Sequence, residues 1–265
     1  MVVSSHHGRI SAHPVLPEAH AAFNSKSSQW GFTLVELAIV LMIIGLLIGG
    51  VLRGQELMKQ ARISSMVQFF KAYEGATHTF MDMYQSFPGD IVNPAARIPN
   101  CSAAPCNTPG DGNGIIGPVA SIGNFQYAVA SENNVFFQQL AAAHLVSGVD
   151  ASTEWEGSQG AAYPMTPLGA VMWIAYYNHF PGNGGSWTTA LQGHWFVLVG
   201  RSPSGFGFTR EAVPIPTLAH LDKKMDDGLP WNGHAVLNSQ GCNHPETEYN
   251  MNKTNSCTFM VRAGF

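Results

Sequence analysis

Residues 31–36 read Gly-Phe-Thr-Leu-Val-Glu and open an apolar run that continues to Leu52. The run carries no charge after Glu36. From Phe32 to Leu52 it would span about 31 Å as an α-helix, which matches the roughly 30 Å hydrocarbon core of a bilayer. A cleaved secretory signal has a shorter apolar core of about 7–15 residues and a small-x-small site after it, and neither is found here. The stretch therefore predicts a membrane-length helix with one carboxylate near its start.

The helical pattern continues past the apolar run. Pro88-Gly89-Asp90 predicts where it ends. We therefore expect one helix of about 54 residues, or about 80 Å. Membrane or like helices would surround its first half (32–52), and a globular domain would cover one face of its second half (53–87). That face is predicted by apolar residues spaced three or four apart, namely Phe69, Tyr73, Ala76, Phe80, Met83 and Phe87.

Residues 88–265 predict a globular head. The chain is loop-rich to about residue 130, and a helix is predicted at Asn133–Leu145. We expect an antiparallel sheet whose apolar face packs against the long helix, which gives an α+β fold. Its strands are predicted from Val, Ile and aromatic residues between Gly and Pro, at Val171–Tyr177, His194–Gly200, Gly205–Arg210, Ala235–Asn238 and Thr258–Arg262.

Composition limits the classes of partner. Charged residues make up 11% of the chain and the formal net charge is −4, against about 25% charged residues in ordinary soluble domains. A mildly acidic chain does not favour nonspecific binding to nucleic acid, so we expect no nucleic-acid partner.

The four cysteines fall into two local pairs, Cys101/Cys106 and Cys242/Cys257. Neither pair has the CxxC spacing of a zinc or redox site. In an exported protein an even number of cysteines most simply forms two disulfides, and proximity favours the local pairing. Four reduced thiols are the alternative.

The Gly-Phe junction, the carboxylate five residues after Gly31 and the long apolar helix together resemble the prepilin family, the precursors of type IV pilins and of type II secretion pseudopilins. The resemblance implies that residues 1–31 form a leader and that a prepilin peptidase cuts between Gly31 and Phe32. It also implies that the new amine of Phe32 is N-methylated. Glu36 would then pair with the Phe32 amine of a neighbouring subunit and set the axial register of a fibre. The alternative role for Glu36 is to stabilise the helix dipole.

The same resemblance implies a precursor in the inner membrane with its head in the periplasm, which later joins a pilus or pseudopilus fibre, in the case of a pilus at the cell surface. The charges beside the apolar run predict the opposite orientation. Arg53, Lys59 and Arg62 follow the run, whereas only Lys26 lies close before it, and the positive-inside rule alone would place the head in the cytoplasm. We follow the junction motif.

Three further segments look like a group of bacterial prepilin-like proteins: Phe87–Asp90, Pro109–Ile115 leading to Glu132, and Leu221–Gly228. A disulfide between Cys242 and Cys257 would resemble the closed C-terminal region of many pilins.

Two acidic segments are candidate calcium sites. Asp111 and Asn113 start a calcium-loop pattern that later residues break, so a Gly-rich turn is the alternative. Asp222, Asp226 and Asp227 form the second candidate, and an ordinary Asp-Gly turn is the alternative there. Some pseudopilins bind calcium, and no other cofactor is expected.

We therefore expect a non-enzymatic structural subunit of a pilus or pseudopilus, with a minor subunit favoured by the length of the head. One alternative is an adhesin or binding module on the same anchor, with Trp187 as the best candidate for an exposed contact. Another is a metal-dependent exported enzyme that uses His234 beside Asp226 and Asp227. The sequence has no HExxH, GxSxG or phosphate-loop motif to support an enzyme.

Overall fold

The computed structural model describes residues 31–117, 131–152, 162–179, 191–201, 208–209, 212–237, 248–249, 251 and 256–265. The chain divides into two compact units, Met1–Val51 and Leu52–Phe265.

Helix α1 covers Leu34–Tyr84, so it begins in the first unit and ends in the second. The prediction of one long helix is confirmed, but the helix ends before Phe87. Gln85 takes a left-handed φ of 52°, and its side-chain amide donates to the carbonyls of Met81 and Asp82 at 3.3 and 3.1 Å. The backbone N–H of Gln85 also donates to Met81 at 2.7 Å, so the side chain adds a second donor there and supplies one to the carbonyl of Asp82 in the last turn.

The second half of α1 buries one face, but that face is shifted from the predicted one. Tyr73, Ala76 and Phe80 are buried as expected, whereas Phe69 is only partly buried and Met83 is 56% exposed. The pattern at Phe69 and Phe70 allows either residue to face inward, and packing on the head selects Phe70. The buried set is Ile63, Met66, Phe70, Tyr73, Ala76, Thr77, Phe80 and Tyr84.

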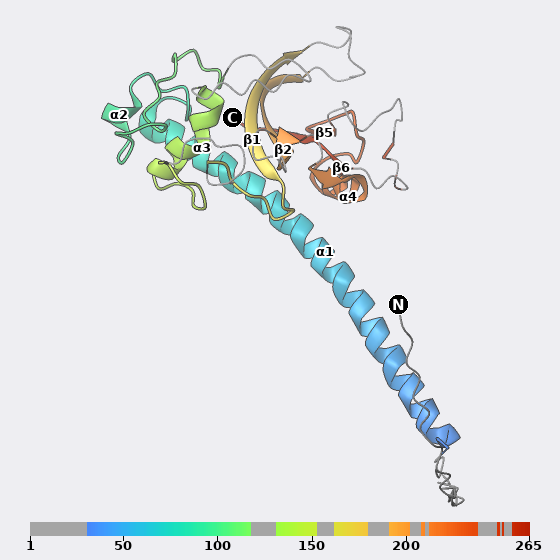
Figure 1. The fold of residues 1–265 in the computed structure, drawn as a ribbon. Coiled ribbons are helices and arrows are strands. Elements are labelled where there is room, and N and C mark those ends of the chain that lie inside the picture. The colour runs from blue at the N-terminus through green and yellow to red at the C-terminus, as the bar shows by residue number, and fades with distance from the viewer. Residues whose placement is uncertain are drawn as a thin grey trace, which may run out of the picture. The chain divides into compact units, whose positions relative to one another are not determined.

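The head contains an antiparallel sheet in the order β1-β2-β7-β5, which confirms the predicted fold class (Figure 1). Its bounds are Val171–His179 for β1, Leu191–Arg201 for β2, Phe259–Arg262 for β7 and Ala235–Leu237 for β5. A two-residue strand, β3 (Phe208–Thr209), pairs with the end of β2. Gly205, in the predicted third strand, lies outside the described residues.

A smaller sheet pairs β4 (Val213–Pro214) with β6 (Ser256–Cys257). The predicted strand at Thr258–Arg262 begins one residue later, because Thr258 separates β6 from β7. Helix α4 (Ile215–Met225) follows β4 directly, and its helical extent was not predicted.

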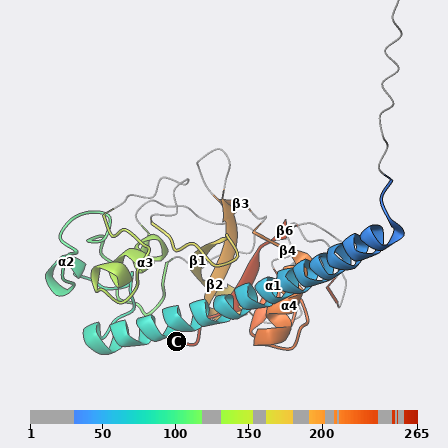
Figure 2. The ribbon, with the colours of Figure 1, turned by 90° about the horizontal axis from the view of Figure 1, so that it is seen from below.

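The core lies between α1, α3 (Glu132–Ala142) and the sheet. The ring of Phe70 on α1 lies 6.1 Å from that of Phe196 on β2, and Tyr73 lies 5.6 Å from Phe137 on α3. In the view from below, the second half of α1 runs along these strands with α4 beside it (Figure 2). The aromatic residues thus fix the helix to the head.

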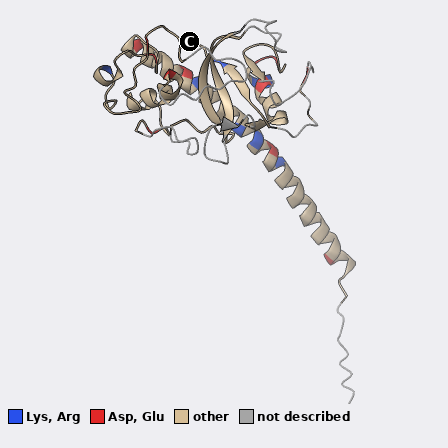
Figure 3. Ribbon diagram, turned by 45° about the horizontal axis from the view of Figure 1, so that its top comes forward, with Lys and Arg blue, Asp and Glu red and all other residues tan. Residues whose placement is uncertain are grey.

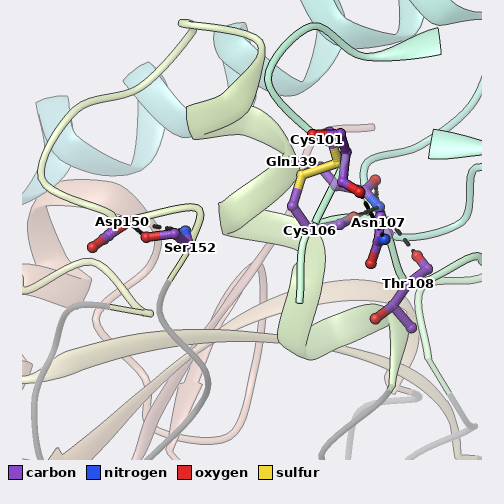
Figure 4. The surroundings of a disulfide bond; sticks show 9 residues. Cys101, Cys106, Asn107, Thr108, Gln139, Asp150 and Ser152 are labelled. Atoms are coloured by element: carbon purple, nitrogen blue, oxygen red, sulfur yellow. Dashed lines mark hydrogen bonds between the residues drawn. A yellow bond between two sulfur atoms is a disulfide. The ribbon is translucent and has the colours of Figure 1, made fainter. Parts of the chain in front are cut away.

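A short helix, α2 (Pro94–Arg97), precedes a disulfide between Cys101 and Cys106 with a Cα–Cα distance of 5.3 Å (Figure 4). The buried Gln139 of α3 lies beside this bridge and donates to the carbonyl of Cys106 at 3.2 Å. Cys257 is also disulfide-bonded. Cys242 lies outside the described residues, so its pairing with Cys257 stays a prediction.

Candidate functional site

The first turn of α1 contains a reciprocal capping box. The backbone N–H and the hydroxyl of Thr33 donate to Oε2 of Glu36 at 2.8 and 2.9 Å, and the N–H of Glu36 lies 3.2 Å from the Thr33 hydroxyl oxygen. This is the Thr-x-x-Glu arrangement that satisfies free N–H groups at the start of a helix. These hydrogen bonds hold the carboxylate of Glu36 beside Thr33, the residue that follows Phe32. Thr33 was not among the predicted site residues, although the Thr-x-x-Glu pattern indicates it.

Gly31 and Phe32, the described residues just before the helix, are both exposed. A Cβ added to Gly31 would meet no atom within 4 Å, and Phe32 is 80% exposed. The described part of the chain therefore gives no internal reason for glycine at this position.

The first half of α1 is an apolar surface with space for other helices. Its hydropathy and length are sufficient to cross a membrane, and none of its most apolar window is buried within the chain. The ribbon carries no charge between Glu36 and the basic and acidic residues that begin at Arg53 (Figure 3). A Cβ at Gly45, Gly49 or Gly50 would also meet nothing within 4 Å. Small residues on such a helix permit close approach of a second helix.

The head brings Asp90, Asp111 and Glu132 together, with carboxylate oxygens within 4.8 Å of one another. Of these three, only Asp111 was predicted as a site residue. Asp90 accepts the backbone N–H groups of Gly112, Asn113 and Gly114 at 2.7, 3.1 and 2.9 Å. Its carboxylate therefore fixes the Gly-rich loop through the backbone.

Glu132 holds the two ends of the same loop. Its two oxygens accept the N–H groups of Asp111 at 2.9 Å and Gly117 at 2.7 Å. Burial raises the pKa of both Asp90 and Glu132, and the backbone N–H groups oppose that rise. Asp111 and Asn113 form an Asx turn, because the N–H of Asn113 donates to Oδ1 of Asp111 at 3.0 Å, and this agrees with the Gly-rich turn that was the alternative to a calcium loop.

Glycine is required where this loop packs closely. A Cβ on Gly89, which has a φ of 89°, would lie 2.3 Å from the carbonyl oxygen of Glu132. A Cβ on Gly110 would lie 2.4 Å from Cα of Asp90. The Phe87–Asp90 and Pro109–Ile115 segments are thus parts of one folded unit with Glu132.

The predicted group of Asp222, Asp226 and Asp227 also comes together, with oxygens within 4.8 Å of one another. Asp222 is fully buried near the end of α4 and accepts the hydroxyl of Tyr249 at 2.8 Å. Burial raises the pKa of Asp222 to about 7; the Tyr249 hydrogen bond opposes this, and Asp227 and Asp226 add to it.

Two other predicted residues do not form a site in the described part of the chain. The contact of His234 with the acidic group is its backbone N–H, which donates to Oδ2 of Asp226. Neither acidic group in the described residues contains a histidine. Trp187 lies outside the described residues.

Comparison with known proteins decides the nature of the N-terminal site. The family model described as the prokaryotic N-terminal methylation motif matches residues 26–52. The chain carries a prepilin-type N-terminus. At this general level it is a pilin-like precursor, which prepilin peptidase processes and which assembles with other pilin-type subunits. Its apolar helix provides the membrane anchor before assembly.

The prepilin-type match covers the junction, Glu36 and the first half of α1, and it ends before the head. No curated protein and no solved structure gave a significant match to the chain.

Proposed function

We propose that this protein is a structural subunit, of the minor kind, in a type IV pilus or a related type II secretion pseudopilus. The match to the N-terminal methylation motif, on a helix whose first half is exposed and uncharged after Glu36, carries this proposal. Cleavage between Gly31 and Phe32 frees an amine that is largely cationic near neutral pH. Methylation of that amine keeps its charge.

The geometry at Glu36 supports an assembly role. Capping uses one carboxylate oxygen, Oε2, for both Thr33 donors. The other oxygen is available to the Phe32 amine of a neighbouring subunit. In an apolar fibre core a carboxylate without a cationic partner is costly, so the pair would favour one axial offset between subunits.

The first half of α1 supplies the surface for this assembly. Its apolar side chains leave the bilayer for the side chains of like helices, and the open glycines allow those helices to approach. The second half of α1 is fixed in the head by Phe70 and Tyr73. Assembly can therefore proceed without unfolding the head.

The alternatives have less support. An adhesive role depended on Trp187, for which the structure gives no information. A metal-dependent hydrolase would need histidine and carboxylate side chains in one site, and the described acidic groups hold carboxylates alone. We therefore propose a non-enzymatic role, with homologous subunits, prepilin peptidase and the inner membrane as partners and no nucleic acid.

Mass spectrometry of the native N-terminus is the direct test. We expect a chain that begins at N-methylated Phe32. A mature chain that keeps residues before Gly31, or one that begins beyond Leu52, would contradict the proposal.

Substitution of Glu36 tests the assembly step. We expect Glu36→Ala to remove the protein from sheared surface fibres or from pseudopili, while its amount in the membrane and the thermal unfolding of the head stay unchanged. Glu56→Ala is a matched control, because Glu56 is an exposed carboxylate on the same helix that accepts the side-chain amide of Gln60, one turn away. Normal incorporation of the Glu36→Ala protein would refute the role given to this carboxylate.

A further inference from the structure

Helix α1 contains a short stretch that belongs neither to the apolar run nor to the part covered by the head. The apolar run ends at Leu52, and the first buried residue of α1 is Ile63. None of residues 53–62 between them is buried. Three of the four cations of α1 lie in this stretch together with one carboxylate, namely Arg53, Lys59 and Arg62 with Glu56.

The three cations have no partner of opposite charge within the described part of the chain. No carboxylate of those residues lies within salt-bridge distance of any of them, and the carboxylate of Glu56 instead accepts the side-chain amide of Gln60 at 3.2 Å. Leu57 and Met58, in the same stretch, are 60% and 59% exposed. Apolar side chains among cations are typical of a helix segment at a membrane surface.

We propose that Arg53, Lys59 and Arg62 form a basic collar that binds the phosphates of anionic lipid headgroups where α1 leaves the hydrocarbon of the membrane. A bilayer is about 30 Å thick in its hydrocarbon and about 40–45 Å with its headgroups, so each headgroup layer is roughly 5–8 Å deep. Arg53 directly follows the apolar run, which places it in this layer. Cations beside a membrane helix are attracted to anionic lipids over about one Debye length, which is about 10 Å in 0.1 M salt.

Helix geometry directs the other two cations toward the bilayer. Lys59 and Arg62 lie about 9 and 14 Å along α1 from Arg53. Side chains on an α-helix are tilted toward its N-terminus, and the N-terminal half of α1 is the half that enters the membrane. The long side chains of Lys59 and Arg62 therefore extend toward the headgroups, where their charges are favourable.

The distribution of the cations around α1 favours lipid over a protein partner. At about 100° per residue, Lys59 lies about 240° and Arg62 about 180° around the helix axis from Arg53. A second helix would contact one face of α1, whereas headgroups surround a membrane helix on all sides. A collar of charge is therefore better matched to a lipid surface than to the acidic residues of a neighbouring subunit.

The basic collar also gives a role to the charges that conflict with the expected orientation. The positive-inside rule treats Arg53, Lys59 and Arg62 only as signals for the side of the membrane on which they stay. Binding to headgroups on the side where α1 emerges would use the same charges in either orientation. This inference needs the membrane anchor but does not depend on the role in a fibre.

The test uses the purified full chain in phosphatidylcholine vesicles that contain a trace of spin-labelled lipid, whose association with the protein is measured by electron paramagnetic resonance. We expect spin-labelled phosphatidylglycerol, an anionic lipid, to associate at least about threefold more strongly than spin-labelled phosphatidylcholine in about 0.1 M NaCl. The ratio should fall toward one in about 1 M NaCl, where the Debye length is about 3 Å. Inorganic phosphate at equal ionic strength should not lower the ratio, and a loss of preference would assign a site for free phosphate and overturn the proposal.

Three variants locate the preference. A chain with Arg53→Gln, Lys59→Gln and Arg62→Gln together should bind the two lipids equally. Lys71→Gln is the matched control and should keep the preference, because Lys71 is an exposed cation of the same helix about 27 Å from Arg53. Glu56→Gln should raise the preference about 1.5-fold, because it removes the negative charge among the cations while Gln can still accept the amide of Gln60. A gain of this kind would not arise from damage to the fold.

Equal association of the two lipids with the unmodified chain would overturn the proposal, and so would a preference that persists in the triple variant. Loss of the triple variant from fibres, with no lipid preference in the unmodified chain, would assign the cations to a neighbouring subunit and also refute lipid binding. None of these readouts depends on cleavage after Gly31 or on Glu36. The role in a fibre and the binding of lipid can therefore fail separately.

Discussion

His194 on β2 is a titratable residue held neutral inside the head. It is buried among the rings of Phe87, Tyr176 and Phe265, and its Nε2 accepts the N–H of Ile116 at 3.1 Å. Burial lowers the pKa of His194 to about 4, against a smaller opposite effect from the backbone of Phe265. Its role is structural, because it ties the loop that contains Ile116 to the sheet.

This lowered pKa predicts a loss of stability in acid. Between about pH 6.5 and 4 the unfolded chain protonates His194 and the folded chain does not, so the free energy of unfolding falls as the pH falls. A shift of this size corresponds to about 3 kcal/mol at most. We expect His194→Gln, which can still accept the Ile116 N–H, to flatten this dependence in urea unfolding measured from pH 7 to 4.

Burial raises the pKa values of Asp90 and Glu132, so the folded chain binds their protons more readily than the unfolded chain. As the pH falls, these two carboxyls therefore raise the free energy of unfolding, opposite to the effect of His194. The unmodified chain and the His194→Gln variant share this contribution from the carboxyls. The difference between their pH dependences therefore measures the effect of His194. An unchanged slope in the variant would show that other groups dominate acid unfolding.

At the scale of elements, α1 shows what a sequence pattern can predict. Hydrophobic spacing predicted the helix and three of its buried residues. It did not predict that Met83 would face solvent, because Met83 and Tyr84 are both apolar enough to satisfy the same spacing. In the structure Tyr84 is the buried one, with its ring 4.5 Å from that of Phe80, and this packing is not visible in the spacing.

The shifted face of α1 predicts unequal effects of truncation. Phe80 is fully buried, so Phe80→Ala should lower the free energy of unfolding by about 3–5 kcal/mol. Met83→Ala, on the exposed side of the same turn, should change it by less than about 0.5 kcal/mol. Urea unfolding of the two variants would measure this, and equal losses would contradict the assigned face.

The candidate sites were predicted only in part for a similar reason. Asp111, Asp222, Asp226 and Asp227 lie in recognisable local patterns. Asp90 and Glu132 are separated from each other along the chain, and only the packing of α3 against the loop brings them together with Asp111. Spacing alone contains no information about such a contact.

Gln139 illustrates the same limit within one element. In the sequence it is a polar residue on a predicted helix, but in the structure it is fully buried. Its side chain accepts the N–H of Gly89 at 2.6 Å and donates to the carbonyls of Cys106 and Thr108 (Figure 4). It joins the turn after α1 to the disulfide loop, a role that depends on three separate segments.

At the scale of the whole molecule, the surface for assembly and the core that stabilises the head lie in different units of the chain. Its first unit presents apolar surface and open glycines, and the second contains its own core. The fold class was predictable because these two parts differ strongly in composition. The details of the loops were not, because they depend on hydrogen bonds between distant residues.

This separation predicts that assembly and stability can be changed independently. Gly49→Leu adds a side chain where no atom of this chain lies within 4 Å, so the melting temperature of the head should not change. Close approach of a second helix would be blocked, and we expect at least a tenfold loss of the protein from fibres. Gly75→Ala is the control, a helical glycine in the second half of α1 with equally open space. Normal incorporation of Gly49→Leu would exclude close helix contact there.

The capping box at the start of α1 has a consequence for subunit addition. Because Thr33 already donates to Glu36 within one chain, this carboxylate has a donor before any neighbour arrives. A neighbouring Phe32 amine can then bind the other oxygen while Thr33 keeps its two hydrogen bonds to Oε2. The carboxylate is thus already oriented at the helix start when a neighbour arrives, and subunit addition does not have to fix its side-chain conformation first.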